Sequence, residues 1–434
     1  MKPRIPTLFF LRSSASLRFS LGFLVACGCA SPPPAPAEYE IVGYYAGWTA
    51  PKFPPTPANI DAAALTVLNY AFLDICWDGR HGHPASGGLA PCIDAGGRPS
   101  TPPDGSLVLG NAALDPANLA ALRELAKANP GLRLVGSVGG WTWSNRFSDM
   151  AASPAARRAF VESTVAFVRH HAFDGIDLDW EYPGDIGVPC PAGHTCQRPE
   201  DKRNFVALAR ELRAALDAAG APDRKRYLFT IAAGADDKFV YDPADSARWL
   251  SELAASLDWI NVMTYDYHGS WSNVSGMNAP FDKVDATLSR YLEIGVPARK
   301  LTLGLPFYGK GWAGCPPGPA GDGLRQSCAG MARGEEDSTF TFAYLAREGY
   351  LSPDALGEHT VAGRGFARHW DRAARVPYLY NPADGVFITY DDEASIRAKL
   401  AYLRRKGLRG AMFWELHADR DRTLGGVVAR GLQR

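Results

Sequence analysis

Eight short apolar segments alternate along this chain with longer amphipathic stretches. Each apolar segment has the length of a buried strand, and helical periodicity fills most of the intervals between them. Strands that alternate with helices favour a parallel sheet, and eight of them predict a closed (β/α)8 or TIM barrel. An open doubly wound sheet is the alternative, but no glycine-rich nucleotide motif follows the first segment. The expected strands are Ile41–Ala46, Leu65–Phe72, Leu132–Ser137, Gly175–Trp180, Tyr227–Ala232, Trp259–Thr264, Leu301–Phe307 and Gly410–Trp414.

Three of the expected helices have readable ends. Ser153 and Pro154 form a good N-cap and first-turn pair for one helix. A second is expected over Asp201–Ala219, ended by Gly220, and a third over Glu393–Lys406, ended by Gly407, because glycine readily takes the backbone conformation that stops a helix.

The interval between the seventh and eighth strands is too long for one helix. We therefore expect a small α+β insertion domain at about residues 313–384, so that the barrel comprises residues 40–312 and 385–434. Strand-like patterns within the insertion cover Phe340–Tyr344 and Val376–Tyr380.

The first residues have the pattern of a targeting segment. Basic residues precede a short apolar run that stops at Cys27, and this run is too short to span a bilayer. Leu24-Val25-Ala26-Cys27 resembles a bacterial lipoprotein box, which predicts a signal peptide over residues 1–26 and a lipid on Cys27. Ordinary cleavage after Ala30 is the alternative. Residues 27–39 are rich in proline and are expected to form an extended tether, so the chain is placed at a bacterial cell envelope, as a lipoprotein expected in the outer membrane, or outside the cell.

Export changes the interpretation of the cysteines. In an oxidising compartment the six cysteines after Cys29 are expected to form three disulfides that staple short loops. A zinc site at Cys190, His194 and Cys196 is the alternative for one pair, but only three ligands lie there. The expected pairs are Cys76–Cys92, Cys190–Cys196 and Cys315–Cys328.

The charge balance argues against one class of partner. The chain has 46 Lys and Arg against 46 Asp and Glu, whereas a nucleic-acid-binding protein needs a basic surface. Its 11 Trp and 17 Tyr fit either a large core or a cleft of rings that stack on sugars. No cofactor or metal is expected, and the protein is expected to be a monomer.

An acidic row ends the fourth expected strand. Side chains alternate along a strand, so Asp177, Asp179 and Glu181 point the same way. Three carboxylates on the inward face of a buried strand are costly to keep charged, which argues against a purely structural role. Catalytic groups sit at the carboxyl end of barrel strands, and Glu181 is the last of the row. The like charges below it should raise its pKa, which suits a general acid.

With Asp174 before it, this row reads Asp174-x-x-Asp177-x-Asp179-x-Glu181, which resembles the signature of the family 18 glycoside hydrolases, the chitinases. The resemblance covers about residue 40 to the C-terminus and implies the barrel with its insertion. Its further motifs are Ser137-Val138-Gly139-Gly140-Trp141, Met263-Thr264-Tyr265-Asp266, Gly410-Ala411-Met412-Phe413-Trp414-Glu415, Tyr44-Tyr45 and Asn69-Tyr70-Ala71-Phe72.

The resemblance implies a mechanism without a protein nucleophile, in which the N-acetyl carbonyl of the substrate attacks its own anomeric carbon. Glu181 would protonate the departing oxygen, Asp179 would orient the acetamido group, and Asp177 would share a proton with Asp179. Tyr265 would donate a hydrogen bond to the acetamido group.

The resemblance also implies a set of sugar contacts. Trp414 would form the apolar floor, Asp266 would contact the same sugar, and Met263 would line the pocket or belong to the core. Trp48, Trp141 and Trp271 follow strand ends and either stack on further sugars or pack within loops. The remaining expected substrate contacts are Tyr45, Phe72 and Tyr308.

Two features depart from the family pattern. Lys310 stands where many relatives carry arginine, and lysine lacks the guanidinium fork. The loop between Cys190 and Cys196 is not part of the general pattern, and it is a candidate for shaping the leaving-group side of the cleft.

The sequence therefore predicts an endo-acting or chain-end chitinase that acts on chitin and chito-oligosaccharides. An endo-β-N-acetylglucosaminidase acting on glycans would share the acidic row, but the insertion favours a groove for linear polymers. A chitin-binding lectin on the same barrel is the other alternative, although such lectins usually lack the terminal acid that Glu181 supplies.

Overall fold

The computed structural model describes residues 39–185, 187–244 and 248–433. The expected signal peptide, Cys27 and the tether up to residue 38 lie outside the described residues. None of the helices in the described part of the chain has the length and apolarity that a membrane span requires.

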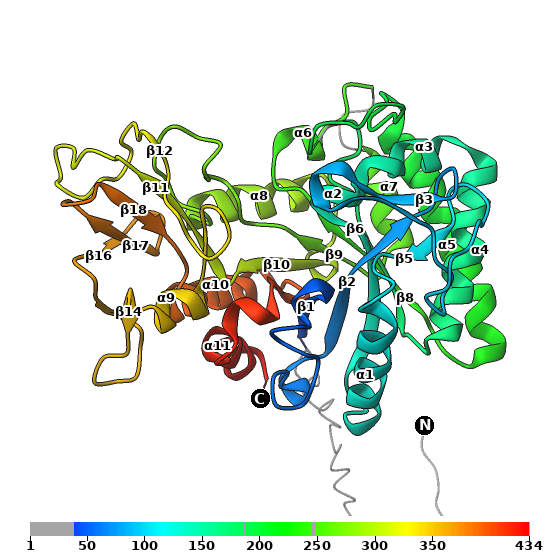
Figure 1. Cartoon of the computed structure of the whole chain (residues 1–434), viewed down its shortest axis with the longest axis horizontal. Helices are drawn as coiled ribbons and strands as arrows, with labels where there is room; N and C mark the ends of the chain where they lie inside the picture. Colours follow the sequence, from blue (N-terminus) through cyan, green and yellow to red (C-terminus); the bar gives the residue numbers. More distant parts are fainter. Residues whose placement is uncertain (1–38, 186, 245–247, 434) are drawn as a thin grey trace, which may run out of the picture. The chain divides into compact units, whose positions relative to one another are not determined.

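Eight parallel strands form a closed barrel (Figure 1), as the sequence predicts. The barrel closes through the pairing of the first two strands, in which Tyr44 is level with Asn69. The short strand β5 (Leu107–Leu109) extends the sheet by antiparallel pairing with the end of β2. In order around the barrel, the strands are β1 (Glu40–Ala46), β2 (Val67–Ile75), β6 (Arg133–Gly139), β7 (Gly175–Asp179), β8 (Leu228–Ala233), β9 (Trp259–Val262), β10 (Leu301–Pro306) and β19 (Gly410–Trp414).

Helices follow most of these strands along the chain. Ser153 caps α4 as expected, since its side chain accepts a hydrogen bond from the Ala156 amide. The expected end of α5 at Gly220 is wrong, because the helix continues to Asp223 and stops at Arg224, which has a positive φ. The α-helices around the barrel are α1 (Asp115–Ala128), α2 (Gly140–Trp143), α3 (Phe147–Ala152), α4 (Pro154–His170), α5 (Asp201–Asp223), α6 (Asp237–Val240), α7 (Arg248–Ser256), α8 (Phe281–Glu293), α10 (Glu393–Lys406) and α11 (Thr423–Leu432).

Short 3₁₀ turns complete the connections. They are η1 (Gly47–Thr49), η2 (Ala62–Ala64), η3 (Pro84–Ser86), η4 (Ser144–Arg146), η5 (Ala298–Lys300) and η6 (Leu416–Asp419). The hairpin of β3 (Arg80–His83) and β4 (Gly88–Pro91) extends the loop after β2.

The barrel wall separates two apolar clusters. The larger one fills the space between the strands and the helices around them. The smaller one lies inside the barrel and includes Val42, Val67, Trp259 and Met412. Residues of one strand alternate between these clusters, so every other position of a strand faces the barrel interior.

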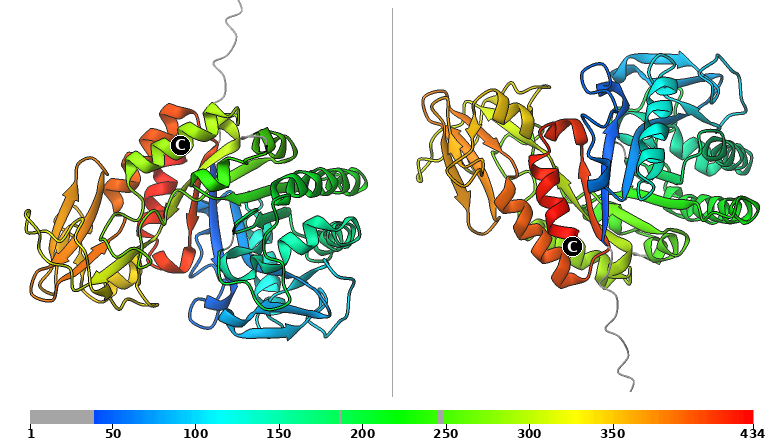
Figure 2. Two further views of the ribbon diagram at one scale, coloured as in Figure 1. Left: turned by 90° about the horizontal axis from the view of Figure 1, so that it is seen from above. Right: turned by 90° about the horizontal axis from the view of Figure 1, so that it is seen from below.

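A second, antiparallel sheet follows β10, and Figure 2 shows it beside the barrel in yellow and orange. This sheet supports the expected insertion, but its first strand begins at Tyr308 and its last long strand ends at Thr389, outside the expected span of 313–384. The expected strand over Phe340–Tyr344 is wrong for its second half, where Thr341 caps a helix instead. The elements are β11 (Tyr308–Ala313), β12 (Gly330–Met331), β13 (Thr339–Thr341), α9 (Phe342–Arg347), β16 (Ala367–Asp371), β17 (Val376–Asn381) and β18 (Val386–Thr389), with a small hairpin of β14 (Leu351–Ser352) and β15 (Val361–Ala362).

All three expected disulfides are present: Cys76–Cys92, Cys190–Cys196 and Cys315–Cys328. The sulfur atoms of Cys190 and Cys196 are bonded to each other, which removes the zinc alternative for this pair.

Candidate active site

The acidic row lies along β7 and points into the barrel. Asp177 and Asp179 are buried, and the strand ladder ends at Asp179, level with Gly139 and Ala232. Glu181 therefore lies just beyond the carboxyl end of the strand, while Trp180 turns to the opposite side and stacks on Phe147. The three carboxyl groups lie close enough together that the charges of Asp177 and Glu181 both act on Asp179.

Asp177 at the base of the row is surrounded by donors. Its Oδ2 accepts hydrogen bonds from the hydroxyls of Tyr44 (2.8 Å) and Ser137 (2.8 Å). Its Oδ1 accepts from the Thr230 hydroxyl at 2.6 Å and the Asn261 amide at 3.3 Å. Burial raises the pKa of Asp177, and these hydrogen bonds oppose that rise by stabilising the ionised form.

Asp179 in the middle of the row has fewer partners. Among the described residues, nothing hydrogen-bonds to its buried Oδ1. Burial raises the pKa of Asp179 far above its ordinary value, and the charges of Glu181 and Asp177 raise it further. The group therefore favours the protonated form, and its Oδ1 is a buried acceptor without a partner among the described residues.

Glu181 at the end of the row has a raised pKa, as a general acid requires. Burial raises its pKa to about 7, a hydrogen bond with Tyr182 opposes this rise, and the charge of Asp266 adds to it. A carboxyl group with this pKa carries a proton near neutral pH and can give it up.

The far wall of the site comes from the ends of β9 and β10. Met263, Tyr265 and Asp266 follow β9, and the Tyr265 ring meets the Tyr308 ring edge to face at 6.1 Å. Burial and then the charge of Asp179 raise the pKa of Tyr265, so its hydroxyl keeps its proton and can donate it in a hydrogen bond. These residues contribute a donor and a half-exposed carboxylate beside the acidic row.

Aromatic rings gather around Trp414 at the end of β19. The Trp414 ring stacks on Phe72 with centroids 5.6 Å apart, and it lies 5.6 Å from Tyr44 and 6.1 Å from Trp48. Met263 and Tyr265 border the same apolar cluster as Trp414. The expected floor residue is thus partly exposed, with apolar rings holding it in place.

Tyr45 does not belong to this site. Its ring is fully buried outside the barrel wall, its hydroxyl donates to the Phe53 carbonyl at 2.8 Å, and it stacks on Tyr70. The expectation that Tyr45 contacts substrate is therefore wrong, because the alternation along β1 turns Tyr44 inward in its place.

Comparisons with known proteins agree with this geometry. The model of glycosyl hydrolases family 18 matches residues 40–419. The chain belongs to this family. It is 42% identical over 431 residues to Chitinase A1 of Niallia circulans, which covers 90% of this chain but only 58% of that protein's length.

Solved structures give the same assignment. Chitinase ChiA74 from Bacillus thuringiensis superposes with a TM-score of 0.80 at 38% identity, over 91% of this chain and 70% of that one. A plant class V chitinase mutant from Cycas revoluta, in complex with (GlcNAc)3, gives a TM-score of 0.69 at 25% identity, over 90% of this chain and 99% of that one.

Lys310, which departs from the family 18 pattern, does reach the site. Its ammonium group lies 3.8 Å from the Asp266 carboxylate and 4.8 Å from the centre of the Tyr308 ring. It also donates a hydrogen bond to the Thr339 hydroxyl at 3.2 Å and lies 5.7 Å from the Trp271 ring. A single positive charge therefore faces Asp266 where a guanidinium fork would offer several directed donors.

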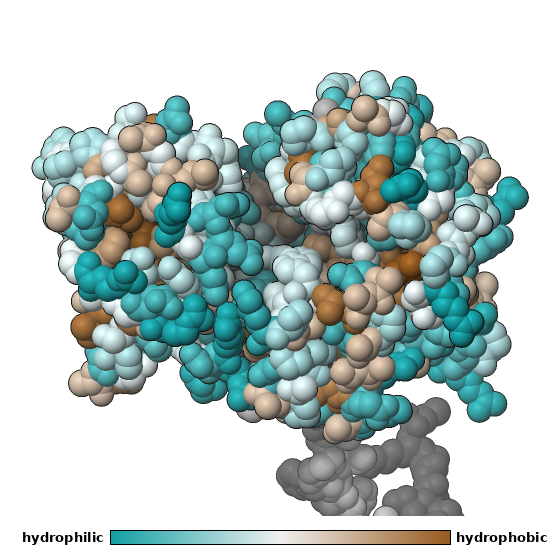
Figure 3. Space-filling view, in the orientation of Figure 1, coloured by the Kyte–Doolittle hydropathy of each residue, from teal (hydrophilic) through white to brown (hydrophobic). Residues whose placement is uncertain are grey.

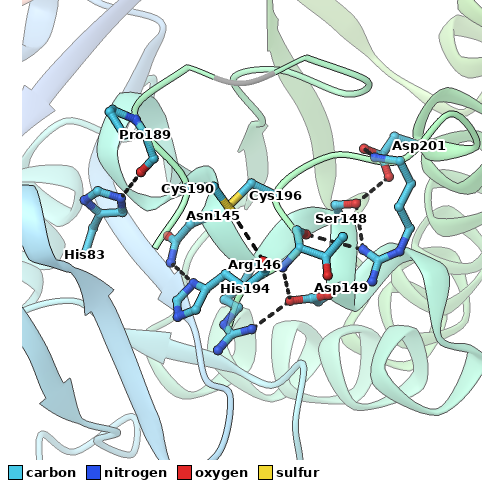
Figure 4. The surroundings of a disulfide bond; sticks show 12 residues. His83, Asn145, Arg146, Ser148, Asp149, Pro189, Cys190, His194, Cys196 and Asp201 are labelled. Atoms are coloured by element: carbon cyan, nitrogen blue, oxygen red, sulfur yellow. Dashed lines mark hydrogen bonds and ion pairs between the residues drawn. A yellow bond between two sulfur atoms is a disulfide. The ribbon is translucent and has the colours of Figure 1, made fainter. Parts of the chain in front are cut away.

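The stretch between Cys190 and Cys196 is the second departure from the family 18 pattern (Figure 4). It lies within residues 187–200, which form the disulfide loop after the acidic row. Its Cys190–Cys196 bond is flanked by His194, which meets the Asn145 amide at 3.0 Å, and by Pro189, whose carbonyl meets His83 at 3.1 Å. Arg198 at its far end bonds to Asp149 and Ser148, and Asp201 accepts a hydrogen bond from the Arg198 amide. The loop is thus fixed to the segment after β6.

This loop begins against the candidate site. A side chain at Gly187 would lie 2.8 Å from the Glu181 carbonyl and 3.0 Å from the Trp141 ring, so the glycine backbone packs onto both. Trp141 is still 51% exposed, Trp48 50% and Trp271 62%, as platforms for sugars would be. The space-filling view shows the surface hollowed between the second sheet and the barrel elements α2 and α6 (Figure 3).

Sequence reasoning missed several residues of the site. Tyr44 and Ser137 were noted only as parts of motifs, and Thr230, Asn261 and Ser144 were not singled out. The strand register would have found two of them, since Ser137 and Thr230 lie directly beside Asp177 on the neighbouring strands. The partners of Asp177 come from four other strands, so no local motif contains them.

Proposed function

We propose that this family 18 protein is a chitinase that hydrolyses β-1,4 bonds between N-acetylglucosamine units. The proposal rests chiefly on the acidic row, which runs from a buried Asp177 with four protein donors, through Asp179 with an unpartnered oxygen, to Glu181 with a pKa of about 7. The relatives named as chitinases support chitin as the proposed substrate. The chain spans about 58% of the length of Chitinase A1.

The proposed reaction proceeds in two displacements. The acetamido oxygen of the substrate attacks its own anomeric carbon, the glycosidic bond breaks, and Glu181 gives its proton to the leaving oxygen. Water then attacks the same carbon from the opposite side, returns its proton to Glu181 and reopens the ring formed by the acetamido group. Two inversions give a β-anomeric product.

Asp179 orients the acetamido group in this scheme. Its free Oδ1 accepts a hydrogen bond from the acetamido N–H, which turns the carbonyl oxygen toward the anomeric carbon. Asp177 shares a proton with Asp179 and so limits the charge of the row. Tyr265 donates a hydrogen bond to the acetamido group.

The remaining expected contacts hold the sugar. Trp414 forms an apolar floor, with Met263 beside it, and Asp266 contacts the same sugar. Phe72, Tyr308 and Trp141 extend the binding surface along the polymer, as an endo-acting or chain-end enzyme requires.

The role of Glu181 as the general acid is tested with Glu181→Gln, which keeps the shape of the side chain and cannot supply the proton. We expect activity on chitin hexamer to fall by roughly 10²–10⁴-fold, the range typical of general acid catalysis. Glu162→Gln, on the exposed face of α4, is the matched control and should keep full activity. Loss of activity in Glu181→Gln with unchanged affinity for oligomers would support Glu181 as the acid of an enzyme. Full activity would indicate that another residue is the acid.

The substrate gives the sharper test of the nucleophile. Fully deacetylated chitosan oligomers should not be cleaved, and partly acetylated ones should be cut only after an acetylated unit. Proton NMR in the first minutes should show the β-anomer. An initial α-anomer, or efficient cleavage after glucosamine, would refute substrate assistance and leave the fold and family unaffected. Action on glycoprotein glycans with none on chitin would favour the endo-β-N-acetylglucosaminidase.

We also propose that the protein is anchored at the cell envelope through a lipid on Cys27. The support is the sequence Leu24–Cys27 alone, because it lies outside the described residues. Mass spectrometry of the mature N-terminus should find a diacylglyceryl group on Cys27. A free amino group on Ser31 would instead indicate secretion without an anchor.

A further inference from the structure

The backbone of Glu181 depends on one side chain outside the strand that carries it. The ladders of β7 with β6 and β8 end at Asp179, so neither neighbouring strand supplies a partner for the Glu181 amide. That amide donates instead to the hydroxyl oxygen of Ser144 at 2.8 Å. Ser144 begins η4, directly after the short helix α2 that follows β6.

The Ser144 hydroxyl joins three backbone groups. Its proton is directed to the Gly140 carbonyl at 2.8 Å, with the Asp179 carbonyl 3.1 Å away. The side chain is buried, so water does not replace these bonds when they are lost. One hydroxyl thus ties the end of β6 to the residues on either side of Trp180.

The other side of Glu181 is fixed as well. The Gly187 backbone packs against the Glu181 carbonyl, so little space is left for the peptide to move in that direction. Ser144 thus bonds to the Glu181 amide and Gly187 packs against its carbonyl, so the backbone that carries the proposed acid is constrained on both sides.

We propose that Ser144 is a positioning residue for the general acid, which it keeps in line with the leaving oxygen. The inference rests on the proposed role of Glu181. Proton transfer is sensitive to alignment, and a displacement of about 1 Å can cost about 10²-fold in rate. The structural alternative is that Ser144 only bonds back to the turn before it, as serine often does in helices.

The chain offers a matched control for that alternative. The Ser163 hydroxyl in α4 also donates a hydrogen bond to a carbonyl four residues earlier, that of Ala159 at 2.6 Å. It accepts a hydrogen bond from a strand amide, that of Leu107 at 2.9 Å. It has no contact with the acidic row in the described structure. Ser163→Ala should therefore lose the same kind of bonds as Ser144→Ala without disturbing Glu181.

The readout is a ratio of two substrates. One is a chito-oligosaccharide whose leaving group is another sugar and needs a proton, and the other is the 2,4-dinitrophenyl glycoside, whose leaving group departs as a stable anion. Ser144→Ala should lower kcat/KM, which reports the first displacement, roughly 10- to 100-fold on the first and less than about threefold on the second. Partial unfolding lowers both rates equally, so it cancels in the ratio.

Ser163→Ala should leave the ratio unchanged. Ser144→Cys, which keeps only a weak acceptor of similar size, should still shift the ratio, though by less than alanine does. An unchanged ratio in Ser144→Ala, or in Ser144→Cys if alanine prevents folding, would overturn the inference. Glu181→Gln on the same substrates separates the two claims. If that variant does not shift the ratio, the proposed acid is wrong. If it does and Ser144→Ala does not, only the positioning role fails.

Discussion

The raised pKa of Glu181 leads to a quantitative expectation for the pH dependence of activity. The acid must be protonated to act, so kcat/KM should fall as pH rises through its pKa of about 7. At pH 6 such a group is about nine-tenths protonated, whereas a carboxyl group at the ordinary value of 4.5 would be about 3% protonated. Burial thus increases the amount of competent acid about 30-fold at that pH.

Asp266→Asn tests the smaller of the two contributions that raise this pKa, the charge of Asp266. Its charge raises the pKa of Glu181, so removing it should move the alkaline limb to lower pH. The Asp266 side chain is 42% exposed, so solvent screens its charge. The midpoint of the alkaline limb should therefore move by less than about one pH unit. Lys310, freed from its partner 3.8 Å away, would add to the shift in the same direction.

The assay is kcat/KM for chitin hexamer from about pH 4 to about pH 10, with the dinitrophenyl glycoside as a control that needs no acid. The control should lack the alkaline limb. Asp266→Asn also removes the substrate contact proposed for Asp266, so only the midpoint of the limb is compared, not the rate. A wild-type midpoint near 4.5, or a limb that moves to higher pH in Asp266→Asn, would refute the reasoning.

Three further tests address separate parts of the site. Trp414→Ala should lower kcat/KM on oligomers about tenfold or more with the fold intact by circular dichroism, because an apolar platform is lost; full activity would refute its role. Tyr44→Phe should lower kcat/KM about tenfold, whereas Tyr45→Phe should lower only thermal stability. Each variant loses one buried hydrogen bond, but only the Tyr44 hydroxyl bonds to Asp177. Equal effects of the two variants on kcat/KM would contradict this. Replacing Cys190 and Cys196 by serine should raise KM for long oligomers more than for short ones, because the loop against Trp141 is loosened; a KM change that is independent of length would assign the disulfide to stability alone.

The barrel and the acidic row were predictable because both depend on local patterns. Buried parallel strands are short continuous apolar runs, and period-two alternation fixes which residues of one strand share a face. The same property explains the error at Tyr45. Every residue of β1 is buried, so the sequence does not show which of the two tyrosines faces inward. Only the pairing of β1 with its neighbours decides it.

The end of α5 was not predictable from composition alone. Gly220 was expected to stop the helix, but it lies within it, and a side chain there would come within 2.1 Å of the Lys225 carbonyl. Glycine is needed at this position because the chain folds back closely after the helix. The same residue type is therefore compatible with a stop signal and with close packing, and only tertiary structure separates them.

The order of protonation along the row follows from how unevenly its partners are distributed. Four donors face Asp177, which lowers the cost of ionising it, while Asp179 has an oxygen without a described partner. Burial raises the pKa of all three groups, but only at Asp177 do several hydrogen bonds oppose it. Negative charge is therefore best tolerated at the base of the row, and protons are held at Asp179 and Glu181. That arrangement keeps the transferable proton at the end of the strand, where the leaving oxygen of a bound polymer would lie.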